Sequence, residues 1–265
     1  MESVHPVQSV EISRFQKLLE GEIAVVTGAA QGNGEAFARA LAACGATVVA
    51  VDRDSEILSK TVNSINSAGG KAINIPMDVS DITACTALAD KISKEVGNTS
   101  ILINNAGIVR RVLTDDDGFI ASIEEQLGVN SMGSVHMVKA LLKQLKATKG
   151  KIINLGSIAS FRPTTGGVGY GMSKGSILLM TQALAAELAP FGIRVNALAP
   201  GVIATPMTAP TRENPEVAQK YFEHIPMRRF GDTEELVGPL LFLVSPMSSY
   251  VTGVMLPVDG GFLTQ

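Results

Sequence analysis

Short runs of β-branched and aliphatic residues recur along the chain, separated by stretches in which apolar positions have helical spacing. The runs are almost continuously apolar, which is typical of strands covered on both faces of a sheet. They predict strands at residues 23–27, 47–52, 72–76, 101–104, 151–155, 194–198 and 254–258, of which the third is the weakest. The amphipathic stretches predict helices at 34–44, 55–68, 81–96, 122–145 and 170–188.

This alternation of strands and helices predicts the fold class. Repeated βαβ units with right-handed crossovers build a parallel sheet with helices on both faces. We therefore expect an α/β protein with a Rossmann-type doubly wound parallel sheet of about seven strands. Residues 1–20 are expected to form an N-terminal extension and residues 21–265 a single domain, because no linker or repeat interrupts the pattern.

Residues 205–230 interrupt the alternation. Four prolines, at positions 206, 210, 215 and 226, lie in this stretch. Long irregular connections in compact domains often carry function. We therefore predict a mobile substrate lid here rather than part of the sheet scaffold.

Composition and charge narrow the class of partner. The 22 Lys and Arg against 25 Asp and Glu give a net charge of −3, which argues against a nucleic-acid or anionic-membrane surface. The two cysteines, Cys44 and Cys85, fall in predicted helices without a partner at metal-ligand spacing, so neither a disulfide framework nor a metal site is expected. These features favour a cytoplasmic protein.

A glycine-rich turn, Thr27-Gly28-Ala29-Ala30-Gln31-Gly32-Asn33-Gly34, joins the first predicted strand to the first helix. Glycines allow a tight turn and a close approach of backbone to ligand, and the N–H groups at a helix start attract phosphate. In this strand–turn–helix context the pattern predicts a dinucleotide site, with a plain structural turn as the alternative. The expected cofactor contacts here are Gly28, Gln31, Gly32, Asn33 and Gly34.

Asp52 ends the second predicted strand, eighteen residues after Gly34. An acidic residue at about 20 residues from the glycines bonds the adenosine ribose hydroxyls in dinucleotide-binding folds. A carboxylate there would repel a 2′-phosphate, so NAD is favoured over NADP. Arg53 follows directly and could instead face such a phosphate, and residues 52–55 could also be only a polar turn that caps the next helix.

Further motifs follow in order along the chain: Asn104-Asn105-Ala106-Gly107, Ser157, Tyr170-Gly171-Met172-Ser173-Lys174, and Pro200-Gly201. Ser157 precedes Tyr170 by thirteen residues and follows Asn130 by twenty-seven. Together with the glycine-rich turn, this ordered set resembles the single-domain short-chain dehydrogenase/reductase family. The resemblance runs from about Gly21 to the end of the sequence.

The chemistry of Tyr170 and Lys174 agrees with this resemblance. They lie four residues apart on a predicted helix and so share a face. A free tyrosine, with a pKa of about 10, is a poor base at neutral pH, but a neighbouring ammonium and a cationic nicotinamide ring both lower that pKa. The resemblance implies that Tyr170 is the general acid/base, that Ser157 binds the substrate oxygen and that Lys174 holds the nicotinamide ribose. It also implies that Asn130 positions a water that relays protons, although a mid-helix Asn can also bond its own backbone.

The resemblance assigns further residues to the cofactor. Asp78 and Val79 are expected at the adenine, the small residues Asn105, Ala106 and Gly107 near the adenosine ribose, and Pro200, Gly201, Ile203 and Thr205 around the nicotinamide. Asp78 could instead cap the next helix, and Thr205 could be a turn hydroxyl. Asn33 departs from the family pattern, which usually has an apolar residue between the last two glycines, and could bond a phosphate or ribose.

These residues predict an NAD(H)-dependent oxidoreductase that interconverts a secondary alcohol of a polyol, sugar or other hydroxy compound and a ketone. The alternative is an NADPH-dependent 3-oxoacyl carrier-protein reductase. A more remote alternative is a catalytically idle dinucleotide-binding scaffold, since fold alone does not fix function.

Substrate contacts and assembly are predicted more loosely. The candidate pocket residues are Ile108, Val109, Arg110, Arg111, Ile158, Ala159, Arg162, Met207, Tyr221, Phe222 and His224. The arginines could recognise a carboxylate or polyol, or simply be solvated surface charges. The predicted helices at 122–145 and 170–188 carry more apolar residues than one core stripe needs: Val135, Met137, Val138, Leu141, Ile177, Leu178, Leu179 and Met180. This surplus predicts burial between subunits in a homotetramer.

Overall fold

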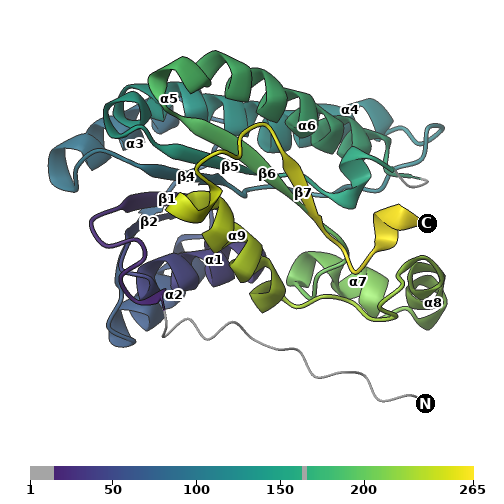
Figure 1. Cartoon of the computed structure of the whole chain (residues 1–265). Coiled ribbons are helices and arrows are strands. Elements are labelled where there is room, and N and C mark those ends of the chain that lie inside the picture. The colour runs from purple at the N-terminus through teal and green to yellow at the C-terminus, as the bar shows by residue number, and fades with distance from the viewer. Residues whose placement is uncertain (1–14, 163–165) are drawn as a thin grey trace.

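A computed structural model of the chain describes residues 15–162 and 166–265 and has a twisted, fully parallel sheet at its centre (Figure 1). The spatial order of the strands in this part of the chain is β3-β2-β1-β4-β5-β6-β7. The strands are β1 (Ile23–Thr27), β2 (Thr47–Asp52), β3 (Lys71–Pro76), β4 (Ile101–Asn104), β5 (Lys151–Leu155), β6 (Arg194–Pro200) and β7 (Met255–Val258). The predicted fold class is confirmed, and each predicted strand is present within one residue of its expected limits, except that β6 runs two residues further.

Helices cover both faces of the sheet (Figure 1). One face carries α1 (Gly32–Ala43), α2 (Ser55–Ser67) and α9 (Val237–Val244). The other carries α3 (Ile82–Glu95), α4 (Phe119–Gln126), α5 (Gly133–Thr148) and α6 (Val168–Leu188). Two short helices, α7 (Ala209–Arg212) and α8 (Pro215–His224), lie beyond the end of β6, within the predicted lid.

Alternating strand residues build the two cores. Val26 and Ala50 pack on the α1, α2 and α9 side, together with side chains such as Phe37. Val25 and Val49 point to the opposite face and pack on α3, α5 and α6. Because both faces are covered, the central strands are almost continuously apolar, which is the pattern that the sequence shows.

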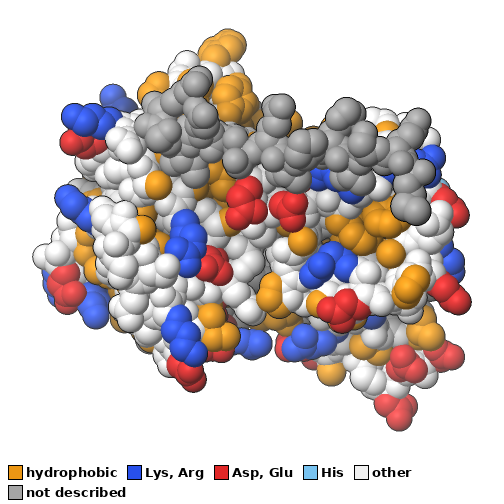
Figure 2. All heavy atoms as spheres, turned by 90° about the horizontal axis from the view of Figure 1, so that it is seen from below, with side chains coloured by type: hydrophobic (Ala, Val, Ile, Leu, Met, Phe, Trp, Pro, Cys, Tyr) orange, Lys and Arg blue, Asp and Glu red, His pale blue; other side chains and the backbone are white. Residues whose placement is uncertain are grey.

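The charged side chains lie on the outside of these layers. The face seen from below in Figure 2 mixes acidic and basic groups, in agreement with the nearly balanced charge of the chain. The cysteines are buried in different cores, Cys44 on the α1 side and Cys85 on the α3 side. Among the described residues, no helix is both long and apolar enough to cross a membrane.

The order of the strands places a crevice beside β1. The chain passes from β1 outward to β2 and β3, and then returns to the other side of β1 as β4. The connections that leave β1 and β4 therefore diverge at the carboxyl ends of these strands, which is where ligands bind in open α/β sheets. The Thr27 hydroxyl fixes this point, because it accepts hydrogen bonds from the backbone N–H groups of Asn105 and Ala106, both at 3.0 Å.

The predicted helix at 122–145 differs from the observed structure. It is divided by a wide π-helical turn, Leu127–Met132, so that α4 and α5 flank that turn. The N–H of Gly133 bonds the carbonyl of Gly128, five residues earlier. Asn130 lies inside this turn, and its side chain is taken up by contacts outside the helix.

The predicted N-terminal extension is described only in part. Residues 1–14 lie outside the described residues. Leu19 is 1% exposed, and its N–H bonds the carbonyl of Cys44 at 2.9 Å. Phe15 packs against the same core. The packed domain therefore reaches back at least to Phe15 rather than beginning at residue 21.

Candidate active site

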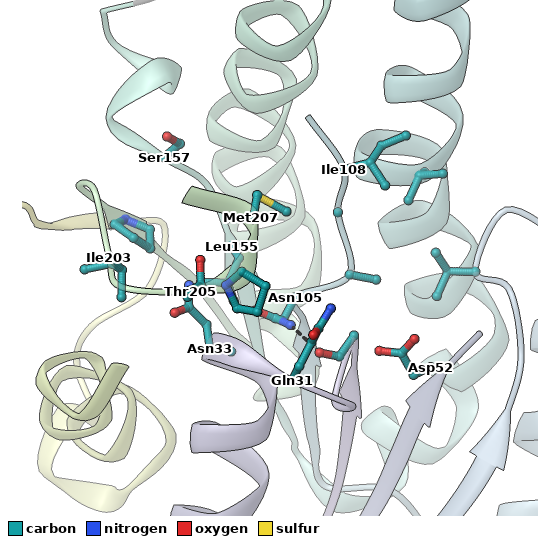
Figure 3. Close-up of a pocket in the computed structure, with 18 of the residues that line it drawn as sticks. Gln31, Asn33, Asp52, Asn105, Ile108, Leu155, Ser157, Ile203, Thr205 and Met207 are labelled. Atoms are coloured by element: carbon teal, nitrogen blue, oxygen red, sulfur yellow. Dashed lines mark hydrogen bonds between the residues drawn. The ribbon is translucent and has the colours of Figure 1, made fainter. Parts of the chain in front are cut away.

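An open hollow lies at the carboxyl edge of the sheet. Asp52 lies at one end and Ser157 toward the other, with the glycine-rich turn and the loop after β6 between them (Figure 3). The hollow brings together these predicted residues: Gly28, Gln31, Gly32, Asn33, Asp52, Arg53, Asp78, Val79, Asn105, Ala106, Gly107, Ser157, Tyr170, Lys174, Pro200, Gly201, Ile203 and Thr205.

The glycine-rich turn needs its glycines for two different reasons. At Gly34 a Cβ atom would lie 2.0 Å from the carbonyl oxygen of Gly28, so no side chain fits where α1 packs on β1. At Gly32 the backbone has a φ of +61°, and a Cβ would lie 3.2 Å from the Cγ2 of Thr205. The turn thus presents bare backbone at the start of α1, where N–H groups and the helix dipole favour an anion.

Asp52 is held in place at the end of β2. Its Oδ2 accepts the N–H of Ala30 and its Oδ1 accepts the N–H of Asp54, both at 3.1 Å. A carboxylate oxygen can accept more than one hydrogen bond, so both oxygens keep acceptor capacity toward the hollow. The predicted capping role falls to Asp54, whose side chain accepts the N–H of Ile57 at the start of α2.

Asp78 forms the neighbouring wall. A hydrogen bond from the backbone N–H of Ser80 lowers the pKa of Asp78, and the charge of Arg53 adds to this lowering against the opposing effect of burial. Arg53 is therefore close enough to Asp78 to interact with it electrostatically. The capping of α3 is done by Asp81, which leaves Asp78 in the hollow.

The catalytic candidates converge near the end of β5. Ser157 begins a short turn whose Ala159 N–H donates to the Ser157 hydroxyl at 3.1 Å. The Ser160 hydroxyl donates to the carbonyl of Lys174 at 2.7 Å, which ties this turn to α6. Tyr170 lies one helical turn before Lys174 on α6, and the Ser157 side chain is close enough to the phenol to affect its pKa. The spacing read from the sequence thus places all three side chains at one point.

Burial controls the ionisation of this group. It raises the pKa of Tyr170 above its ordinary value, and the hydrogen bond from Ser157 and the charge of Arg111 only partly oppose that rise. Burial also lowers the pKa of Lys174 to about 8. In the chain by itself desolvation outweighs the nearby positive charges. The expected lowering of the tyrosine pKa includes the charge of the oxidised nicotinamide ring, and it stays a prediction.

Lys174 reaches across to the sheet. Its ammonium Nζ donates to the carbonyl of Leu155 at 2.7 Å and lies 5.9 Å from the centre of the Tyr170 ring. A Cβ at Gly107 would lie in ordinary contact with the same Nζ, at 3.5 Å, and closer to the Oδ1 of Asn130, at 3.2 Å.

Asn130 uses its whole amide within the protein. Its Oδ1 accepts the N–H of Ile108 at 2.7 Å, and its Nδ2 donates to the carbonyl of Ile108 and to the Ser173 hydroxyl, both at 2.9 Å. These bonds hold the loop after β4 against α6. They make Asn130 a positioning residue in this structure, and its predicted role in a proton relay stays a prediction.

The predicted lid forms the remaining wall through its first residues. Thr205, Pro206, Met207 and Thr208 line the hollow. Arg212 of α7 donates to the carbonyl of Thr205 and to the Thr208 hydroxyl, both at 3.3 Å, which ties α7 to this wall.

The candidate substrate residues separate into three groups. Ile108 and Met207 line the hollow. Tyr221, Phe222 and His224 pack instead around Phe230 and Phe262, in an aromatic cluster that also contains Ile158. Arg110 is engaged by Glu125 through two hydrogen bonds, of 3.0 and 2.9 Å, and Arg162 donates to the carbonyl of Gln265 at 2.7 Å.

Several residues that shape the hollow carry no sequence signal. Val51, Met77, Val129, Leu155, Gly156, Pro206 and Thr208 line it without belonging to a recognised motif. The Thr27 hydroxyl and the Leu155 carbonyl act through contacts with segments more than 18 residues away. The one sequence signal for Thr27 and Leu155 as site residues is that each lies at the carboxyl end of a predicted strand.

The hollow fits a dinucleotide on observations independent of any motif. Bare glycine backbone opens α1, a fixed carboxylate marks one end, and a hydroxyl–phenol–ammonium group marks the other. The Oδ1 of Asn33 is buried between them without a hydrogen-bond partner. Within residues 15–162 and 166–265, no group of three or more His, Cys, Asp or Glu is arranged to hold a metal ion.

Comparison with known proteins gives consistent matches over the whole domain. A family model described as Enoyl-(Acyl carrier protein) reductase matches residues 28–263. The chain is 41% identical over 250 residues to galactitol 2-dehydrogenase (L-tagatose-forming) of Cereibacter sphaeroides, covering 92% of this chain and 96% of the relative. It is 38% identical to a 3-oxoacyl-[acyl-carrier-protein] reductase of Aquifex aeolicus, covering 92% and 98%.

A solved structure agrees with these matches. A gluconate 5-dehydrogenase from Burkholderia cenocepacia, in complex with NADP and tartrate, superimposes with a TM-score of 0.89 at 31% identity. The match covers 96% of this chain and 99% of that protein.

Proposed function

The chain belongs to the short-chain dehydrogenase/reductase family, and on that premise we propose that it is an NAD(H)-dependent dehydrogenase that interconverts the secondary alcohol of a polyhydroxylated compound and a ketone. The observation that carries this proposal is the geometry of the hollow. Ser157, Tyr170 and Lys174 meet at one end, and the fixed carboxylate of Asp52 stands at the other.

The reaction assigns one task to each side chain. The oxidised nicotinamide, when bound, accepts the hydride that leaves the alcohol carbon. Tyr170 removes the hydroxyl proton in oxidation and returns it in reduction, and Ser157 donates a hydrogen bond that fixes the reacting oxygen. Lys174 supplies positive charge beside the phenol and hydrogen bonds the cofactor ribose. Burial raises the pKa of Tyr170 in the chain alone and so disfavours the phenolate. The positive charges of Lys174 and of the oxidised ring act in the opposite direction and favour it.

Asp52 supports NAD as the cofactor. Its carboxylate faces the hollow and is anchored by two backbone N–H groups, which suits it to accept hydrogen bonds from both adenosine ribose hydroxyls. A 2′-phosphate would meet the charges of Asp52 and Asp78 together. Arg53 also lines the hollow, and its charge acts on Asp78.

Arg111 favours a second candidate substrate class, the hydroxy acids. Its guanidinium donates to the Thr211 hydroxyl of α7 at 3.5 Å, and its charge lowers the pKa of Tyr170. A cation beside the reacting point suits a substrate carboxylate. The relative that is in complex with tartrate carries a hydroxy acid, whereas the galactitol dehydrogenase is named for a neutral polyol.

A panel of substrates with both cofactors tests the proposal. Neutral polyols, sugar acids and a 3-oxoacyl thioester would each be assayed with NAD(H) and NADP(H), by the absorbance of the reduced nicotinamide. We expect alcohol oxidation with NAD, at a kcat/KM at least about tenfold above that with NADP. Efficient reduction of the thioester with NADPH would favour the 3-oxoacyl reductase instead. Cofactor binding without turnover of any substrate would favour the idle scaffold.

Assembly as a homotetramer in the cytoplasm is part of the same proposal. Of the surplus apolar residues, Met137 and Ile177 are buried in the cores of the chain itself. Leu179 is 68% exposed, and Val135, Met132 and Met172 are exposed apolar side chains on the same helical layer. Light scattering tests this, and a solution mass of one chain would rule it out.

A further inference from the structure

Asn33 has a side-chain acceptor that the described part of the chain leaves unused. It is the second residue of α1 and lines the hollow. Its Oδ1 is buried without a hydrogen-bond partner among the described residues. Two other buried side-chain oxygens share this condition in the described part of the chain, on Thr99 and Asn104, and neither residue lines the hollow.

Such an arrangement is costly in the chain alone. A buried acceptor without a donor loses its bond to water and gains nothing in return. An apolar side chain of the same size would fill the space without that penalty. An amide side chain is therefore favoured at this position only if a ligand supplies the hydrogen-bond donor that the protein lacks.

The place of Asn33 in the hollow limits which part of a dinucleotide it meets. Figure 3 shows it beside Thr205, on the side of the glycine-rich turn away from Asp52. The backbone at the start of α1 passes close to Thr205. A Cβ added at Gly32 would lie only 3.2 Å from the Cγ2 of Thr205. A dinucleotide with its adenosine at Asp52 and its reacting ring at Tyr170 must pass this point with its nicotinamide half.

The chemistry of the amide selects a group on that half. The orphaned atom is an acceptor, so it needs a donor, and a pyrophosphate offers none. A primary amide offers both an acceptor and a donor pair, which is matched by another primary amide. The carboxamide is the group of that kind on the nicotinamide ring.

We propose that Asn33 is a cofactor-positioning residue that pairs with the carboxamide of the nicotinamide ring and so fixes the rotation of the ring against the substrate. The proposal rests on the proposed function, because it assumes a nicotinamide cofactor. Where the family pattern has an apolar side chain that packs beneath the ring, Asn33 would make a directional hydrogen bond instead.

Three ligands and two variants test the proposal by calorimetry. The ligands are NAD⁺, its 3-acetylpyridine analogue, in which a methyl group replaces the carboxamide NH₂, and ADP-ribose, which lacks the ring. The variants are Asn33→Leu, which keeps the size of the side chain, and Asn63→Leu on the exposed face of α2 as a matched control.

We expect the wild type and the Asn63→Leu control to bind NAD⁺ about tenfold more tightly than the acetyl analogue, corresponding to one lost hydrogen bond. In Asn33→Leu this ratio should fall to within about twofold, while the affinity for ADP-ribose stays unchanged. The variant without ligand should also melt about 2–4 °C higher, because the orphaned acceptor is gone.

Other outcomes overturn the proposal in distinguishable ways. An equal loss of affinity for all three ligands would place Asn33 at the pyrophosphate or ribose. An unchanged ratio with a lower melting temperature would make it a structural residue. If the wild type binds ADP-ribose but Asn33→Leu changes nothing, the inference fails alone, whereas no binding of any dinucleotide would remove the proposed function as well.

Discussion

Lys174 should destabilise the folded chain in a way that depends on pH, and Lys174→Met should expose this cost. Lys174 is 5% exposed, and burial lowers its pKa from 10.5 to about 8. At 1.36 kcal/mol per pKa unit, keeping the buried ammonium charged costs a net of about 3 kcal/mol at neutral pH.

The sign of the pH dependence follows from linkage. Between about pH 8 and pH 10.5 the unfolded chain holds a proton on Lys174 that the folded chain has released. Wild-type stability therefore rises with pH across this window relative to a variant that lacks the group. From pH 7 to pH 9.5 the stability of the wild type relative to Lys174→Met should increase by about 2 kcal/mol.

Urea unfolding of the cofactor-free proteins at both pH values measures this difference, with the protein concentration held fixed because assembly contributes to stability. Lys220→Met, at an exposed lysine of α8, is the matched control and should show a constant difference from the wild type. Parallel pH profiles for Lys174→Met and the wild type, within about 0.5 kcal/mol, would refute the buried-charge reasoning. The same variant should lose both turnover and cofactor affinity, because Lys174 serves both.

Three further predictions concern the site. Tyr170→Phe should lower turnover by about 10²–10⁴-fold or more while leaving the NAD dissociation constant nearly unchanged, and a variant with over a tenth of the wild-type rate would contradict the acid/base role. Asp52→Ser should reduce the ratio of kcat/KM for NAD to that for NADP by about tenfold, equivalent to one charge-assisted hydrogen bond, and Arg53→Ala should change NAD kinetics little; a wild-type preference for NADP would reverse this assignment. Arg111→Gln should move the pH profile of alcohol oxidation upward by less than about one unit, because the Arg111 charge lowers the pKa of Tyr170, and should raise KM for hydroxy acids but not for neutral polyols; an unmoved profile would separate Arg111 from the site.

The residues that could be predicted from the sequence are those fixed by local rules. Gly34 must be glycine because β1, the turn and α1 meet there, and that meeting is visible as a strand–turn–helix pattern. Asp52 follows from its position at the end of an apolar run. Tyr170 and Lys174 follow from helical periodicity, once their helix is recognised.

The residues that escaped prediction act through distant partners. The Thr27 hydroxyl binds a loop 78 residues away, and its place at the start of the glycine-rich turn does not reveal that contact. Tyr221 and His224 are residue types that often line substrate pockets, but here they pack on Phe262, because the end of the chain returns to cover them. The sign of the Tyr170 shift also depends on burial, which only the packed structure supplies.

The wide turn at Leu127–Met132 has a consequence for insertions and deletions. A π-helical turn accommodates one residue more than an α-helical turn, so the residues on either side keep their rotational phase about the helix axis. Deleting Gly128 should therefore convert the turn to ordinary α-helix and leave the buried faces of α4 and α5 where they are. It would, however, withdraw Asn130 from Ile108 and Ser173. A deletion of one residue should thus keep α4 and α5 folded but remove the contacts by which Asn130 supports the site. Activity could therefore be lost here in evolution while the fold is kept.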